Sequence, residues 1–215
     1  MKTVSINEII STNKKVYESL AIQFKNKIKI RKKNSGIAVN FFIKYFNNKL
    51  NKNIIELGPG SGYVCKLFVE KGFKTTAIEF SPKMAAICKE TSPETEVIID
   101  EFLKHNFGKK KYSGVITLAF IHLFPRTKTR LVLKKIKKLL VPGGLAFITT
   151  TKHDYSEEGF LVKKNFRGKF PRFRRKFTEE EFNRELKKAN MTVVAKNYVR
   201  DYEESGKLWM DYVLK

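Results

Sequence analysis

An acid, three closely spaced glycines and the start of a helix lie together in NIIELGPGSGY, residues 53–63. A strand that runs through such a turn into a helix brings its backbone close to a ligand at the carboxyl edge of a parallel sheet. Dinucleotide sites use the spacing G-x-G-x-x-G. Here Gly58, Gly60 and Gly62 alternate evenly, and Glu56 precedes them by two residues. A carboxylate at that place repels a pyrophosphate and attracts positive charge, so the segment favours a cationic adenosyl cofactor.

His122 is the histidine that the sequence nominates as a catalytic base. It follows the apolar run GVITLAF, and an imidazole accepts a proton near neutral pH. The alternative is a structural histidine whose ring nitrogens form hydrogen bonds within its loop. His105 and His153 stand beside charged residues and are expected to be solvated.

The segment LVKKNFRGKFPRFRRKF, residues 161–177, interleaves cations with Phe166 and three further phenylalanines. Such a pattern binds single-stranded nucleic acid by stacking and charge. Alternatively, Arg172, Arg174 and Arg175 hold one anionic group of a small substrate through bidentate hydrogen bonds. A third interpretation is a loop whose phenylalanines pack inward while its charges stay in water. The sequence leaves all three open.

Short β-branched runs alternate with amphipathic segments from residue 53 onward, which predicts βαβ units on a parallel sheet. The predicted strands are 53–57, 74–79, 95–100, 114–120 and 145–151, and the predicted helices begin near 61, 81 and 127. After a basic loop and a helix, the runs 191–200 and 207–215 are joined closely enough to form an antiparallel hairpin at a sheet edge.

Helix-end signals support this assignment. Ser81 with Pro82 is typical of a helix start, and Thr178 with Glu181 forms a capping box. The residues VPGG, 141–144, are expected to end a helix and turn the chain into the next strand. Before the first strand, residues 6–24 and 35–50 show helical periodicity, and the basic stretch 25–34 is predicted to be a loop between them.

Positive charge dominates the 215-residue chain, with 44 Lys and Arg against 21 Asp and Glu. The formal net charge of +23 attracts anions, which include nucleic acid, acidic membrane surfaces and small phosphorylated or carboxylated substrates. Solvated lysine-rich faces without a functional partner are the other interpretation. Residues 51–100 alone are not basic, with six cations against seven acids.

The two cysteines, Cys65 and Cys88, lie in predicted helices without the spacing of a disulfide framework or a zinc site. We therefore expect no metal and a reducing, cytoplasmic setting. The sequence contains no apolar run of the roughly 18 residues that a membrane span needs and no secretory leader, so no membrane partner is expected.

These motifs together resemble the class I S-adenosylmethionine-dependent methyltransferases over roughly residues 53–215. In that family the first strand ends in an acid followed by G-x-G-x-G, as in ELGPGSG here. The resemblance implies that Glu79 holds the ribose hydroxyls and that Asp100, or its neighbour Glu101, reaches the adenine. The segment GVITLAFIHLFP resembles the passage under the methionine part of the cofactor. The remaining predicted cofactor contacts from these segments are Phe80, Met84, Phe102 and Ala119.

Residues 1–50 look similar to the helical lid of small-molecule members, with residues 51–215 as the cofactor-binding domain. Tyr17 stands where such lids contact the cofactor carboxylate, and the resemblance implies that it also borders the substrate. Many relatives carry a second tyrosine seven residues later, where this chain has Phe24. The implied fold is a doubly wound α/β domain with a mostly parallel seven-stranded sheet, an antiparallel C-terminal hairpin and an N-terminal helical lid.

Three functions remain open on the sequence alone. The first is methyl transfer to an oxygen or nitrogen of a small, anionic metabolite by a monomer or homodimer. The second is RNA methylation that uses the basic surface. The motif of Asn or Asp, two prolines and an aromatic, which marks enzymes that methylate adenine amines or glutamine, is absent after the fourth strand. The third is a non-catalytic binding module that keeps the methyltransferase fold.

Overall fold

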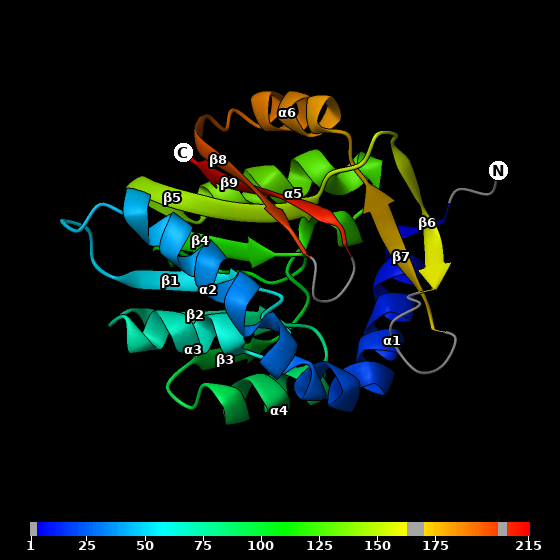
Figure 1. Ribbon diagram of the computed structural model, residues 1–215, viewed down its shortest axis with the longest axis horizontal. Coiled ribbons are helices and arrows are strands. Elements are labelled where there is room, and N and C mark those ends of the chain that lie inside the picture. The colour runs from blue at the N-terminus through cyan, green and yellow to red at the C-terminus, as the bar shows by residue number, and fades with distance from the viewer. Residues whose placement is uncertain (1–3, 163–169, 202–205) are drawn as a thin grey trace.

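The computed structural model describes residues 4–162, 170–201 and 206–215, and for residues 29–31 the backbone alone. Phe166, one of the phenylalanines of the basic segment 161–177, falls outside these residues. Seven strands form one sheet in the order β3-β2-β1-β4-β5-β9-β8 (Figure 1). Their bounds are β1 (Asn53–Leu57), β2 (Lys74–Glu79), β3 (Glu96–Ile99), β4 (Tyr112–Leu118), β5 (Leu140–Thr151), β8 (Val193–Arg200) and β9 (Leu208–Leu214). The first five run parallel, and β9 is antiparallel to β5 and β8, which confirms the predicted fold class.

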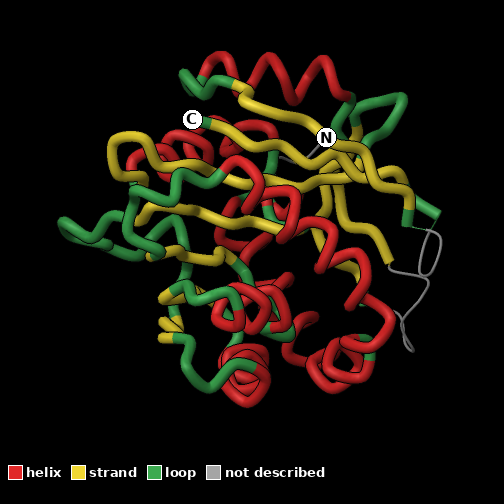
Figure 2. Tube along the Cα trace, turned by 60° about the vertical axis from the view of Figure 1, so that its left-hand side comes forward, coloured by secondary structure: helices red, strands yellow, loops and turns green. Residues whose placement is uncertain are grey.

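Helices cover both faces of the sheet (Figures 1 and 2). One face packs against α2 (Ile28–Tyr45) and α3 (Tyr63–Glu70), and the other packs against α5 (Arg126–Lys138) and α6 (Glu179–Lys188). Beyond α3 lies α4 (Pro82–Thr91), which contacts β3 and β2. Because both faces are covered, the middle of β1, β4 and β5 is apolar, whereas Glu56 and Glu79 lie toward the carboxyl ends of β1 and β2.

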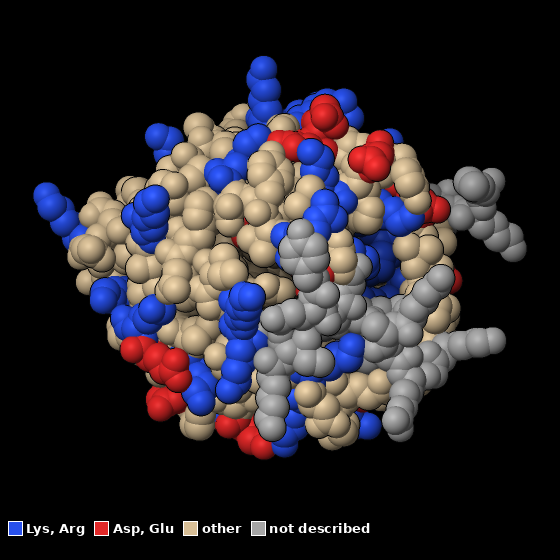
Figure 3. Space-filling model, in the orientation of Figure 1, with Lys and Arg blue, Asp and Glu red and all other residues tan. Residues whose placement is uncertain are grey.

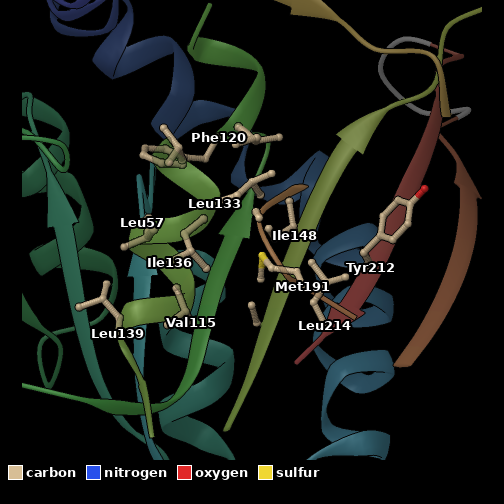
Figure 4. Packing of buried hydrophobic residues seen from close by; sticks show 14 of the residues in the cluster. Leu57, Val115, Phe120, Leu133, Ile136, Leu139, Ile148, Met191, Tyr212 and Leu214 are labelled. Atoms are coloured by element: carbon tan, nitrogen blue, oxygen red, sulfur yellow. The ribbon is translucent and has the colours of Figure 1, made fainter. Parts of the chain in front are cut away.

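The larger core lies between the sheet and α5. Leu57, Val115 and Ile148 point from their strands toward Ile136 of α5, and Tyr212 of β9 joins them (Figure 4). All five side chains are buried. This packing holds the carboxyl ends of β1, β2 and β4 in fixed positions, and these ends carry the predicted site.

The predicted helix caps are present. Ser81 Oγ accepts a hydrogen bond from Met84 N at 3.3 Å and Pro82 begins α4. Thr178 Oγ1 accepts from Glu181 N at 3.2 Å at the start of α6.

Two predicted loops are regular structure instead. The basic stretch 25–34 is helical except at Lys27, which alone separates α1 (Ile6–Asn26) from α2. The run of charges in this stretch indicated a loop. Lysine is nevertheless a good helix former, and its propensity is compatible with the helix seen here. The residues VPGG lie inside β5, because Leu140 already pairs with Tyr112 before a register shift.

The predicted basic loop after β5 contains a two-stranded antiparallel hairpin, β6 (Glu157–Val162) and β7 (Pro171–Lys176). These strands were not predicted, because arginines occupy buried positions at which a strand pattern normally has apolar residues. Arg172 and Arg175 are both buried beside Phe173. Figure 1 shows this hairpin next to α1, away from the main sheet.

The two N-terminal helices pack differently. Ala38, Val39 and Phe42 of α2 belong to the apolar cluster on the sheet. In contrast, α1 contacts α4 and β7. The division into a lid at 1–50 and a domain at 51–215 stays a prediction.

Among the helices in the described part of the chain, none combines the length and the apolarity needed to cross a bilayer.

Candidate cofactor and acceptor site

A cavity of about 650 Å³ opens at the carboxyl edge of the parallel strands and is bordered by α1, β7 and the β8–β9 hairpin. It gathers twelve of the predicted site residues from distant parts of the sequence. They are Tyr17, Glu56, Gly58, Gly60, Glu79, Phe80, Asp100, Glu101, Phe102, Ala119, Arg172 and Arg174. Four predicted residues do not line it, namely Gly62, Met84, His122 and Arg175.

The glycine turn forms the floor of this cavity. Gly58, Gly60 and Gly62 all have positive φ, at +68°, +57° and +77°, a conformation that other residues adopt only with strain. A Cβ on Gly62 would lie 2.7 Å from Cys88 Cα, so this glycine allows α3 and α4 to approach. A Cβ on Gly60 would meet nothing closer than Met84 Cε at 4.0 Å. The space above Gly60, which we call the cradle, therefore has room for ligand atoms.

Glu56 is buried at the end of β1, where the Cys65 thiol donates a 2.9 Å hydrogen bond to its Oε2. Burial raises the pKa of Glu56 to about 7, although the hydrogen bonds from Cys65 oppose the shift. A buried carboxylate that lacks a cation is stabilised by a positively charged ligand. Glu56 thus suits the ammonium of an amino-acid moiety.

Glu79 ends β2 one strand away, and its Oε1 accepts a 3.0 Å hydrogen bond from Ser81 N. Burial raises the pKa of Glu79 to about 7 against the hydrogen bonds from the backbone of Ser81, Phe80 and Gly60. The bond to Gly60 ties this carboxylate to the glycine turn. Glu79 therefore borders the same cradle as a hydrogen-bond acceptor for hydroxyl groups.

Asp100 and Glu101 follow β3. His105 Nδ1 lies 2.8 Å from Asp100 Oδ2, and Asp100 Oδ1 accepts a hydrogen bond from Glu101 N. These contacts, first of all that to His105, lower the pKa of Asp100. Lys104 Nζ lies 2.9 Å from Glu101 Oε2. Both acids line the cavity, and which of them reaches an adenine stays open.

Tyr17 and Arg172 join α1 to the hairpin across the cavity. Arg172 Nη1 donates a 3.0 Å hydrogen bond to Tyr17 Oη, and Tyr17 stacks on Phe24 at 5.3 Å between ring centroids. Phe24 is buried and also lines the cavity. The hydrogen bond between Arg172 and Tyr17 brings a phenol hydroxyl and a guanidinium together at the cavity wall, and both groups can donate hydrogen bonds to an anionic group.

Arg174 lines the cavity, whereas Arg175 points into the protein. Arg175 Nη2 forms a 2.7 Å ion pair with Glu181 and Arg175 Nη1 donates to Thr129 Oγ1. The structure therefore gives Arg175 a place in the packing of β7 on α5 and α6.

His122 lies in the short helix η1 (Ile121–Leu123), fully buried and outside the cavity lining. Neither ring nitrogen forms a hydrogen bond within the described residues, and burial lowers the pKa of His122 well below its usual range. Its role as a base stays a prediction that this placement does not favour. The expectation of solvated His105 and His153 is wrong: both are half-buried, and His153 Nε2 lies 2.8 Å from Thr151 Oγ1.

Sequence reasoning missed several residues of the cavity wall. Asn13, Thr149, Trp209 and Asp211 line it from α1, β5 and β9. An available signal for Asp211 was a lone acid inside the apolar run KLWMDYVLK. Asn13 carried no such signal, because its partners are 160 residues away.

Asn13 fastens α1 to β7 in the manner of a strand partner. Its Oδ1 accepts a 2.8 Å hydrogen bond from Phe173 N, and its Nδ2 donates to Phe173 O at 3.4 Å.

Asn13→Leu is expected to leave these buried backbone groups unpaired, at a cost of about 1–3 kcal/mol. Hydrogen exchange at the Phe173 amide should then speed up. Asn7→Leu, an exposed change on the same helix, is the control, and equal protection of Phe173 in both variants would contradict the assignment.

Comparison with known proteins finds methyltransferases. A family model described as a methyltransferase domain matches residues 31–196. An uncharacterized methyltransferase of Bacillus cytotoxicus is 34% identical over 104 residues, which are 48% of this chain and 49% of the relative. Ribosomal RNA small subunit methyltransferase A of Mycoplasmopsis pulmonis is 37% identical over 68 residues, 31% of this chain and 27% of the relative. The chain thus spans about half the length, or less, of these curated relatives.

Among solved structures, Burkholderia thailandensis 1,6-didemethyltoxoflavin-N1-methyltransferase superposes with a TM-score of 0.78. It is 17% identical, and the match covers 100% of this chain and 91% of that chain, which shows a shared fold. That structure holds S-adenosylhomocysteine, and a glycopeptide N-methyltransferase of the same fold holds S-adenosylmethionine. The predicted family is confirmed, and the cofactors held by these structures are the predicted cofactor and its demethylated product. Because the family model matches well over half of the sequence, this chain belongs to the methyltransferase domain family, as a class I S-adenosylmethionine-dependent methyltransferase.

Proposed function

We propose that this protein transfers a methyl group from S-adenosylmethionine to an oxygen or nitrogen of a small metabolite that carries an anionic group. The observation that carries the proposal is one cavity with two kinds of wall. Glu56, Gly60 and Glu79 border its sheet edge, and Arg172 and Arg174 border it from β7. The first set fits the cofactor and the second fits an anionic acceptor.

The residues present fit the cofactor. Glu56 would hold the ammonium, and Glu79 would hold the ribose hydroxyls. Because Gly60 has no side chain, the ligand can lie close to its backbone. When bound, S-adenosylmethionine supplies a methyl group activated by its sulfonium. The protein then contributes mainly orientation and exclusion of water. Tyr17 of α1 and Arg172 of the β6–β7 hairpin form a further wall of the cavity.

The two arginines that line the cavity are the reason for proposing that the acceptor carries an anionic group. Arg172 is buried and fixed by Tyr17, so little side-chain entropy is lost when it binds a ligand. Figure 3 shows basic side chains at the bottom of a hollow on the side of the molecule where β7 lies. The similarly folded 1,6-didemethyltoxoflavin-N1-methyltransferase holds the small molecule 1,6-didemethyltoxoflavin, which supports a small-molecule acceptor. We further propose that α1 is the moving part of the lid, because α2 belongs to the sheet core.

RNA is the second candidate acceptor. The partial match to ribosomal RNA methyltransferases and the net charge of +23 favour it. Figure 3 shows lysine and arginine side chains spread over this face rather than gathered in one track. RNA binding of this kind weakens steeply as salt rises. An affinity for mixed RNA that survives only at low salt would mark non-specific attraction.

Cofactor binding is expected to release protons. Burial raises the pKa values of Glu56 and Glu79 to about 7, so below neutral pH these carboxyls are partly protonated in the free protein. A cationic ligand and hydroxyl donors favour the ionised forms and lower both pKa values. Calorimetry at pH 6.5 in phosphate and in imidazole buffer, which differ in ionisation enthalpy, measures the released protons.

The raised pKa values of Glu56 and Glu79 determine the direction in which cofactor affinity changes with pH. The affinity for S-adenosylmethionine is expected to fall as the pH drops from about 8 to about 6, because protonation competes with the ligand. Identical binding heats in the two buffers, with an affinity independent of pH, would contradict the roles of Glu56 and Glu79.

A further inference from the structure

Asp211 is a buried acid that the roles assigned above leave unused. It lies on β9 opposite Thr149 of β5 and Asn197 of β8, and it lines the cavity while only 3% exposed. Among the described residues, no lysine, arginine or histidine forms an ion pair with it. A buried carboxylate without a cation is costly, so the presence of Asp211 here points to a cation that arrives with a ligand.

The electrostatic surroundings of Asp211 support this reading. Burial raises the pKa of Asp211 to about 7, and a hydrogen bond from Asn197 opposes the shift. Acids and bases both share the cavity with it. The charged groups that line the cavity are Glu56, Glu79, Asp100 and Glu101 at the sheet edge, Arg172 and Arg174 on β7, and Asp201 and Lys207 on either side of the β8–β9 turn.

Position separates Asp211 from the acids proposed to hold the cofactor. Glu56 and Glu79 end β1 and β2, whereas Asp211 lies two strands beyond β4, with β5 between them. Its partner Thr149 contacts the end of β4, because Thr149 Oγ1 accepts a 3.2 Å hydrogen bond from Ala119 N. Ala119 is where the resemblance places the methionine part of the cofactor. Asp211 is therefore on the acceptor side of that point, the side that also holds Trp209.

We propose that Asp211 binds a cationic nitrogen of the methyl acceptor and accepts a proton from it, so that the acceptor is a small zwitterion with an ammonium and an anionic group. This inference rests on the proposed methyltransferase function. In the step, one N–H bond breaks, the proton bonds to a carboxylate oxygen of Asp211, and the electron pair stays on nitrogen as the nucleophile. The anionic group of the same molecule binds Arg172 and Arg174.

Four probes of one shape separate the charges of the acceptor. They are 4-(aminomethyl)benzoate, a zwitterion; 4-(hydroxymethyl)benzoate, an anion; 4-methylbenzylamine, a cation; and 4-methylbenzyl alcohol, which is neutral. Each is titrated by calorimetry into protein saturated with S-adenosylhomocysteine. We expect the zwitterion to bind at least tenfold more tightly than any other probe. Its affinity should fall below pH 7, as protonation neutralises Asp211.

Asp211→Asn keeps the shape of the side chain and removes its charge. In this variant the zwitterion is expected to bind no better than the anion, while S-adenosylhomocysteine binds as before. Asp154→Asn, an exposed acid, is the control and should keep the preference. Equal affinity for the four probes, binding of none of them, or a preference that survives Asp211→Asn would overturn the inference. Failure to bind S-adenosylhomocysteine at the start would instead overturn the proposed function.

Discussion

Gly60→Ala is expected to weaken S-adenosylhomocysteine binding by at least tenfold, about 1.4 kcal/mol, in a protein that still folds. The new methyl group would project into the cradle, where no protein atom lies closer than 4.0 Å and ligand atoms are proposed to lie. Because Gly60 also has φ +57°, an alanine there adds backbone strain of about 1–2 kcal/mol. The measurement is calorimetric titration, with thermal unfolding to confirm the fold.

Gly72→Ala separates the two effects. Gly72 has φ +78°, and a Cβ there would meet nothing within 4 Å, but it lies outside the cavity in the turn before β2. Both variants should lose similar stability, and only Gly60→Ala should lose affinity. If the two bind S-adenosylhomocysteine equally well, the space above Gly60 is not the cofactor cradle.

Arg175→Leu is expected to lower the free energy of unfolding by about 3 kcal/mol, near the low end of the range for breaking a buried ion pair. Glu181 would lose its 2.7 Å partner while remaining buried. The loss is moderated because Arg126 Nη2, at 3.2 Å, and Ser156 Oγ, at 2.7 Å, also reach Glu181. Urea unfolding followed by circular dichroism measures the change.

Arg175→Leu combined with Glu181→Leu should recover much of the lost stability, since no buried charge remains without a partner. Arg174→Leu, on the cavity side of the same strand, is expected to change stability far less. A stable Arg175→Leu protein with weakened acceptor binding would return Arg175 to the acceptor site and contradict its structural role.

The sheet and the cofactor end of the cavity could be predicted from the sequence because their signals are local. Strand, glycine turn and helix follow one another within residues 53–70, and Glu56 and Glu79 end consecutive strands of the parallel sheet. Parallel strands carry such ends to one edge without further information. The same locality made Ser81 and Thr178 readable as caps.

The proposed acceptor end of the cavity could not be predicted in this way, because long-range contacts create it. The strand character of β7 is hidden by Arg172 and Arg175, which are buried and contact Tyr17 of α1 and Glu181 of α6. Asn13 meets Phe173 across most of the chain. His122 lies just past β4 and was predicted to be a base, yet its side chain is fully buried and does not line the cavity.

The most direct test of the central claim, that this cavity binds S-adenosylmethionine, is the fluorescence of Trp209. It is the only tryptophan in the chain and it lines the cavity. We expect S-adenosylmethionine and S-adenosylhomocysteine to produce a saturable change in emission with a micromolar dissociation constant, and NAD to produce none. No saturable response to either adenosyl ligand, with calorimetry equally silent, would contradict the account.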